Sequence, residues 1–174
     1  MTKYAATPTG REVFFDSDEI IVSKSDLKGR ITYANEVFCG VAGYTEEELL
    51  GQPHSIIRHP DMPRAAFKYL WDRIQSGDEI FVYVKNMAKT GDHYWVLAHV
   101  TPTFDAAGSI IGYHSNRRVP DRKAVEAMEK IYAEVKAAED AEVNGKDALA
   151  AGMRCLEGAI AASRMSFDEL VFSL

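Results

Sequence analysis

The chain has 174 residues, of which 47% are hydrophobic, so it is long enough for one domain with a sizeable core and an appendage. Its formal net charge of −6 and the absence of a Lys/Arg block argue against nucleic acid as the main partner. Residues 1–11 lack the basic start and apolar run of a signal peptide, and no apolar stretch approaches the length of a membrane span. Two cysteines do not make a disulfide framework. We therefore expect a soluble, cytoplasmic protein that does not insert into the membrane.

The first third of the chain predicts an arm, a hairpin and two short helices. Residues 1–16 are polar and are expected to form an N-terminal arm or cap. Strand-forming residues at 20–22 and 30–34, separated by a turn, predict a β-hairpin. Asn35 is a candidate cap for one helix, and Thr45 opens a capping box for the next.

Residues 52–63 pack two His, one Arg, one Asp and three Pro into twelve positions. Each proline removes a backbone donor and biases the preceding residue away from the helical region, so the stretch cannot be one regular element. Apolar residues at i, i+3, i+4 and i+7 then predict an amphipathic helix to about residue 76. Polar side chains on a stiff turn before a helix suit an anionic or heteroaromatic ligand, and the alternative is a proline-rich corner with surface polar groups.

The remainder of the chain predicts three strands and then helices. Strand signals cover 80–89, 93–104 and 109–118, with turns between them. Together with the first hairpin, they predict an α+β fold with a five-stranded antiparallel sheet and short helices on one face. Residues 121–174 contain no proline and carry two apolar helical stripes and a capping box at Ser166, which predicts a C-terminal α-helical extension.

Several motifs resemble the PAS domain of bacterial aerotaxis transducers. They are residues 35–44, residues 47–54, Arg58-His-Pro-Asp-Met-Pro63, Val84-Lys-Asn86, Gly91-Asp-His-Tyr-Trp-Val96 and Gly112-Tyr113. The Arg-His-Pro-Asp-Met-Pro and Gly-Asp-His-Tyr-Trp-Val motifs are similar to the flavin-binding aerotaxis branch in particular. The resemblance implies a PAS fold, with an arm at 1–16, a PAS sensor domain at 17–120 and the helical extension at 121–174. Aerotaxis transducers carry membrane and signalling regions in the same chain, and because neither is visible here we expect a stand-alone soluble protein.

The resemblance also implies a non-covalent FAD site. Arg58 is suited to bidentate phosphate contact, His59 to a further hydrogen bond, and Asp61 to orienting either one. The family pattern adds Asn86, and we include Trp71 and His54 as further candidate cofactor-binding residues. The alternative for Arg58 and Asp61 is a surface salt bridge with a helix cap.

One strand departs from the aerotaxis pattern. Where that pattern has Trp and Gly before Val-Lys-Asn, this chain has Ile80 and Val82. Strand alternation places Phe81 and Tyr83 on the opposite face, so neither replaces the lost Trp directly. A reshaped slot, a different cofactor and the loss of binding all stay open.

Other chemistries have weaker sequence support. His54, His93, His99 and His114 raise haem as an alternative cofactor, but no motif selects one of them. Metal-ligand spacings, catalytic triads and P-loops are absent, so we expect neither a metal site nor an enzyme. Cys39 lies in a helical stripe outside the motif of light-sensing PAS domains and is predicted to be a core residue.

The resemblance therefore implies a bacterial signal-transduction protein, an FAD-binding redox or oxygen sensor similar to energy-taxis sensors. Its expected partner is a signalling protein such as a membrane-bound chemotaxis transducer, or a second copy of the chain. The alternatives are a haem-binding gas sensor and a cofactor-free interaction module. The two C-terminal stripes either fold back as a cap or form an interface, in which case the interface residues are Met128, Ile131, Tyr132, Val135, Leu149, Met153, Leu156 and Ile160.

Overall fold

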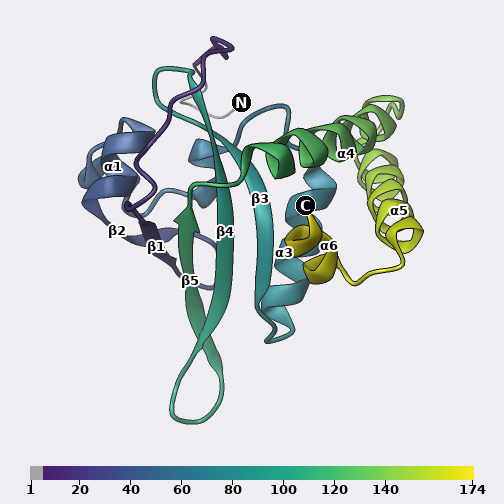
Figure 1. Cartoon of the computed structure of the whole chain (residues 1–174). Coiled ribbons are helices and arrows are strands. Elements are labelled where there is room, and N and C mark those ends of the chain that lie inside the picture. Colours follow the sequence, from purple (N-terminus) through teal and green to yellow (C-terminus); the bar gives the residue numbers. More distant parts are fainter. Residues whose placement is uncertain (1–5) are drawn as a thin grey trace.

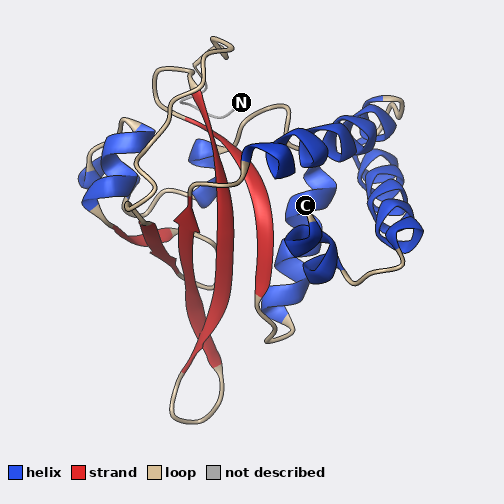
Figure 2. Cartoon of the chain, viewed as in Figure 1, coloured by secondary structure: helices blue, strands red, loops and turns tan. Residues whose placement is uncertain are grey.

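A computed structural model describes residues 6–174, which form a five-stranded antiparallel sheet with helices around it (Figures 1 and 2). The spatial order of the strands is β2-β1-β5-β4-β3. The strands are β1 (Ile21–Ser25), β2 (Ile31–Ala34), β3 (Ile80–Met87), β4 (His93–Phe104) and β5 (Ile110–Arg118). The predicted α+β class and antiparallel sheet are confirmed, and pairing of β1 with β5 joins the two halves of the sheet.

Short helices connect β2 to β3 and cover one face of the sheet, called here the inner face. They are α1 (Glu36–Ala42), α2 (Glu46–Leu49), the 3₁₀ helix η1 (His54–Ile57) and α3 (Arg64–Gln75). The predicted caps are present, because Asn35 accepts from the Phe38 amide and Thr45 forms a capping box with Glu48. α3 follows Pro63, which supplies no side-chain cap.

The two faces of the β3–β4 ladder carry different side chains. Val82 pairs with Ala98 on the inner face, where both side chains are buried. Phe81 lies on the opposite, outer face, where its ring stacks on that of His99 with 4.1 Å between centroids. Strand alternation therefore separates Phe81 and Tyr83 from Ile80 and Val82, as expected from the sequence.

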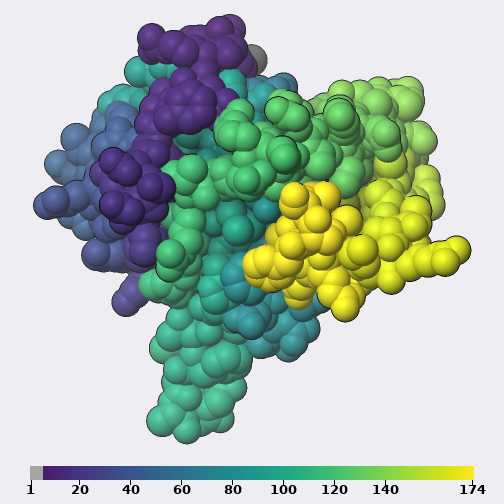
Figure 3. Space-filling view, viewed as in Figure 1, coloured from purple at the N-terminus to yellow at the C-terminus, as the bar shows by residue number. Residues whose placement is uncertain are grey.

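The C-terminal helices fold back onto the domain. They are α4 (Arg122–Asp140), α5 (Gly145–Ser163) and α6 (Phe167–Ser173), and Figure 3 shows them as one mass beside the sheet. The Tyr132 hydroxyl of α4 donates to the Tyr83 carbonyl of β3 at 2.8 Å, and the ring of Phe172 lies edge-on to Phe81. α5 packs on α3 instead, and α3 thus lies between α5 and the sheet.

This packing bears on both expectations for the extension. Met128, Tyr132, Val135 and Leu156 were candidate interface residues, and all four are buried within the chain, where the helices fold back on the domain. The other four candidates are partly exposed, so an interface there stays a prediction: Ile131, Leu149, Met153 and Ile160. None of the helices in residues 6–174 has the length and hydropathy that a bilayer span requires.

The described part of the N-terminal arm lies along the turn between β3 and β4. The amides of Thr9 and Val13 donate to the carbonyls of Gly91 and His93 at 3.0 and 2.7 Å. The side chain of Arg11 pairs with Asp92, and hydrogen bonds from Arg11 and Thr9 hold the pKa of that carboxyl well below its usual range. Residues 1–5 of the predicted arm lie outside the described residues.

Candidate functional site

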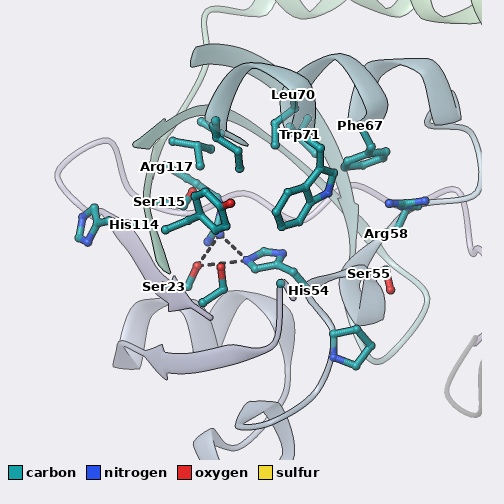
Figure 4. Close-up of a pocket in the computed structure, with 18 of the residues that line it drawn as sticks. Ser23, His54, Ser55, Arg58, Phe67, Leu70, Trp71, His114, Ser115 and Arg117 are labelled. Atoms are coloured by element: carbon teal, nitrogen blue, oxygen red, sulfur yellow. Dashed lines mark hydrogen bonds between the residues drawn. The ribbon is translucent and has the colours of Figure 1, made fainter. Parts of the chain in front are cut away.

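A cavity of about 280 Å³ lies between the inner face of the sheet, η1 and α3 (Figure 4). Its volume is close to the lower end of the range for small-molecule sites, about 300–1,000 Å³. The apolar walls come from Phe67, Leu70, Trp71, Ile74, Val84, Ala98 and Val100. The polar groups include Ser23, His54, Arg58, Asn86, Ser115 and Arg117. Apolar walls with a few polar groups are typical of sites that bind flat organic ligands.

Trp71 forms one wall of the cavity and is fixed by its neighbours. The helical period of α3 places it one turn after Phe67, on the same side of the helix. Its ring lies edge-on to Tyr113 with 5.3 Å between centroids. On its other side the β1–β2 turn comes so close that a Cβ added to Gly29 would lie 2.9 Å from Cζ2 of Trp71. The indole is thus held in place at the cavity by both contacts.

Arg117 is the most unusual polar group of the cavity. Alternation along β5 points it inward, where it is 3% exposed. Its Nη2 donates to Ser23 Oγ and to His54 Nε2, both at 2.6 Å (Figure 4). Among the described residues no carboxylate pairs with it, and its buried Nη1 has no hydrogen-bond partner. A buried cation with a free donor is costly unless something else in the cavity compensates it.

The charge state of this cluster follows from burial. Burial lowers the pKa of Arg117 to about 10, so the guanidinium stays charged at neutral pH. Burial and then the charge of Arg117 lower the pKa of His54 to about 3, so the imidazole is neutral. Because Arg117 only donates, Nε2 of His54 must accept, which assigns its proton to Nδ1. The cavity therefore presents positive charge and donors, which suits an anionic or electron-rich ligand.

Four of the six predicted site residues line the cavity, namely His54, Arg58, Trp71 and Asn86. The guanidinium of Arg58 lies over the ring of Phe67, with Cζ 3.9 Å from its centroid, at the opposite side of the cavity from Arg117 (Figure 4). A backbone bridge joins Arg58 to Asn86 and brings η1 to the edge of β3. The Nε of Arg58 is buried and has no partner in residues 6–174, which leaves one donor free.

The other two predicted residues, His59 and Asp61, lie outside this cavity. His59 is buried, and its Nδ1 accepts from the Asp61 amide at 3.1 Å. The Asp61 carboxylate is exposed and accepts a hydrogen bond from Lys85 Nζ at 2.8 Å, so it forms a salt bridge, but with Lys85 rather than Arg58 and without capping a helix. Both residues therefore fix the turn that follows Arg58, and neither lines the cavity beneath α3. His59 and Arg58 together border a separate pocket on the other side of this turn, which Glu139 of α4 also lines.

Sequence reasoning missed Ser23, Ser115 and Arg117. The signal was available in β5, where Tyr113, Ser115 and Arg117 occupy successive inward positions of a strand that should turn apolar residues to the core. The hydroxyl of Ser115 is buried and, within the described chain, unpartnered. Polar residues at every inward position indicate a lined cavity rather than packed core.

The histidines are hydrogen-bonded, stacked on other rings or directed away from the cavity. Nε2 of His54 is occupied by Arg117 and Ser23. His114 borders the cavity, but its ring points away from it in Figure 4. His99 stacks on Phe81 on the outer face, and His59 pairs edge-on with His93 at 5.7 Å.

Comparison with known proteins places this geometry in a family. The PAS fold model matches residues 31–117. The aerotaxis receptor of Escherichia coli (strain K12) is 44% identical over 115 residues, which cover 66% of this chain and 22% of the receptor. The nitrogen fixation regulatory protein of Klebsiella pneumoniae is 27% identical over 99 residues, or 57% of this chain and 20% of that protein. This chain thus spans about a fifth of the length of these curated relatives.

A similar fold occurs among solved structures. The structure reported as "Flavin Analogue Sheds Light on Light-Oxygen-Voltage Domain Mechanism" superposes with a TM-score of 0.58 and 21% identity, covering 63% of this chain and 84% of that one. At this identity the likeness concerns the fold alone. The aerotaxis receptor is 44% identical to the aligned part of this chain, and because the PAS fold model matches half of its length, the chain belongs to the PAS family.

Proposed function

We propose that this PAS domain binds FAD in the cavity beneath α3 and reports the redox state of that cofactor. The observation that carries the proposal is Arg117, a buried cation that lines an apolar, aromatic-walled cavity and whose Nη1 has no hydrogen-bond partner among residues 6–174. The motifs that resemble the flavin-binding aerotaxis branch, and the 44% identity to an aerotaxis receptor, support the same ligand class.

The residues present fit a flavin. Trp71 supplies an aromatic wall for a flat ring system, and Arg117 and Ser115 supply unpartnered donors for its polar edge. Arg58, at the opposite side of the cavity, offers a cation for the phosphate groups. Because the cavity of about 280 Å³ is small, we expect it to hold the ring system while the rest of the cofactor extends past Arg58.

A bound flavin would supply reversible one- and two-electron chemistry. Arg117 would favour the more negative, reduced state of a ring beside it, since a cation in a low-dielectric site stabilises nearby negative charge. Its hydrogen bonds reach Ser23 on β1 and His54 on η1, so a change in its contacts is passed to two elements at once. We propose that the domain conveys this change to a signalling protein such as a membrane-bound chemotaxis transducer.

An absorption spectrum of the purified protein, before and after incubation with FAD, tests the proposal. We expect flavin bands in the blue, lost on dialysis from Arg117→Met but retained by Arg118→Met, in which the exposed neighbouring arginine is changed instead. A Soret band would identify haem. A wild-type protein that stays colourless with excess FAD would refute flavin binding and favour a cofactor-free interaction module.

A further inference from the structure

The N-terminus of α3 is capped by a side chain 75 residues away in the sequence. Pro63 gives no side-chain cap, so the first amides of the helix need another acceptor. Glu139 of α4 provides it, because its Oε2 accepts from the Arg64 amide at 3.0 Å and its Oε1 from the Ala65 amide at 2.8 Å. Glu139 is only 4% exposed, and its negative charge lies at the positive end of the helix dipole.

α5 closes over the same carboxylate. Gly152 of α5 faces Glu139 so closely that an added Cβ would lie 2.6 Å from both Cγ and Oε1. Beside this contact, Ala65, Val135 and Leu156 form a small apolar cluster that joins α3, α4 and α5. The C-terminal helices are therefore attached to α3 at a specific buried point, with hydrogen bonds, charge and apolar packing together.

This attachment point lies next to the cavity. The capped residues Arg64 and Ala65 are within two turns of Phe67 and Trp71, which form the cavity wall. Burial and the charge of Arg64 lower the pKa of Arg58, and the negative charge of Glu139 partly offsets this by raising it. One carboxylate thus influences both the helix that walls the cavity and the cation at its side.

We propose that Glu139 is a positioning residue that couples occupation of the cavity to docking of the α4–α5 hairpin on α3. A ligand that contacts Phe67 and Trp71 orders α3, which favours the capped and docked state. Because such coupling is reciprocal, undocking of the hairpin lowers the affinity of the cavity for its ligand by the same factor by which ligand binding favours docking. Undocking also exposes Val135 and Leu156, which gives the domain a state-dependent apolar surface. The ligand named in the test, FAD, rests on the proposed function.

Three alanine variants test the coupling. Glu139→Ala removes the cap, whereas Gly152→Ala keeps the carboxylate and displaces it. Gly158→Ala, in the same helix and with open space around it, is the matched control for the change in helix propensity. We expect the Kd for FAD to rise about tenfold in the first two variants and to stay unchanged in the third. Glu139→Gln retains one acceptor and should give an intermediate value.

Hydrogen exchange supplies a readout that separates coupling from general loosening. In wild-type protein, FAD should slow exchange in both α3 and the α4–α5 hairpin, and this response of the hairpin should vanish in Glu139→Ala and Gly152→Ala. Wild-type affinity in both variants, or a wild-type hairpin indifferent to FAD, would overturn the proposal. If the wild-type protein binds no FAD, the proposed function fails by itself. The cap is then judged by exchange at Arg64 and Ala65, which must accelerate in both variants.

Discussion

Replacing Arg117 with methionine should stabilise the cofactor-free protein and weaken its binding of FAD. Burial lowers the pKa of Arg117 to about 10 from an ordinary arginine value above 12. At about 1.4 kcal/mol per pKa unit, holding this charge costs the folded state about 3 kcal/mol. For a base with a lowered pKa in the folded state, this cost is fully present below pH 10 and is relieved only above it.

The gain from removing the charge is partly offset by lost contacts. Methionine cannot replace the hydrogen bonds to Ser23 and His54, worth about 1 kcal/mol each. Those two partners lie 3.1 Å apart and can still bond each other, so neither is left wholly unsatisfied. Methionine also loses the cation–π contact of Arg117 with Phe38, in which Cζ lies 5.1 Å from the ring centroid. The net expectation is a stabilisation of at most about 1 kcal/mol, which for a chain of this size raises the Tm by at most about 2–4 °C.

Paired measurements on one variant give the reasoning a sharp test. Thermal melting without cofactor reports stability, and flavin fluorescence titration reports affinity, with Arg118→Met as the control in both. Loss of a charge-assisted hydrogen bond of about 1.5–3 kcal/mol should raise the Kd for FAD by roughly ten- to a hundredfold. A variant that melts lower than wild type and binds FAD equally well would identify Arg117 as a structural cation and refute its assignment to the ligand.

Three further outcomes are expected. Arg58→Ala should weaken FAD binding by roughly ten- to a hundredfold, measured as retention on dialysis, without unfolding the domain, because Arg58 is a charged donor at the side of the cavity. A variant that keeps its full complement of FAD would contradict the assignment of Arg58 to the site. Gly29→Ala should lower the Tm because Gly29 has φ +74°, and it should change flavin emission because the added Cβ would press against Trp71. An unchanged emission spectrum would show that Trp71 does not contact the ligand. Arg11 lowers the pKa of Asp92, so the stability that this pair contributes is full above about pH 4 and is lost as the pH falls below that value. Hydrogen exchange of the N-terminal arm should therefore accelerate in acid. An Asp92→Asn variant should remove this pH dependence.

Local signals explain why the elements were predictable. The caps at Asn35, Thr45 and Ser166 depend on side chains three residues from their partners, and all three are observed. Alternation fixed which residues of β3 share a face. The apolar stripes of residues 121–174 showed that each helix buries one side, but a stripe does not identify what covers it. The answer depended on contacts such as Glu139 with Ala65, which are distant in sequence.

Most of the candidate site that was predicted correctly lies in motifs, and Trp71 is the exception. Arg58 and Asn86 lie in motifs shared with the aerotaxis branch, and both line the cavity. Arg117 was missed because its role depends on the register of β5 against β1, which places it beside Ser23, 94 residues away. Asp61 was placed with Arg58 because both belong to the Arg-His-Pro-Asp motif, whereas the chain turns between them and the Asp61 carboxylate bonds Lys85.

The contacts of Tyr132 have a consequence for how copies of this domain can associate. β3 is an edge strand, and such strands commonly recruit foreign strands through unpaired backbone groups. Here Tyr132 occupies the Tyr83 carbonyl, Met62 Sδ accepts from the Lys85 amide, and η1 bridges to Asn86. Strand addition at β3 is therefore blocked by the chain's own side chains and backbone. Assembly through this side of the sheet therefore has to use side-chain surfaces, and β3 is protected from edge-to-edge aggregation.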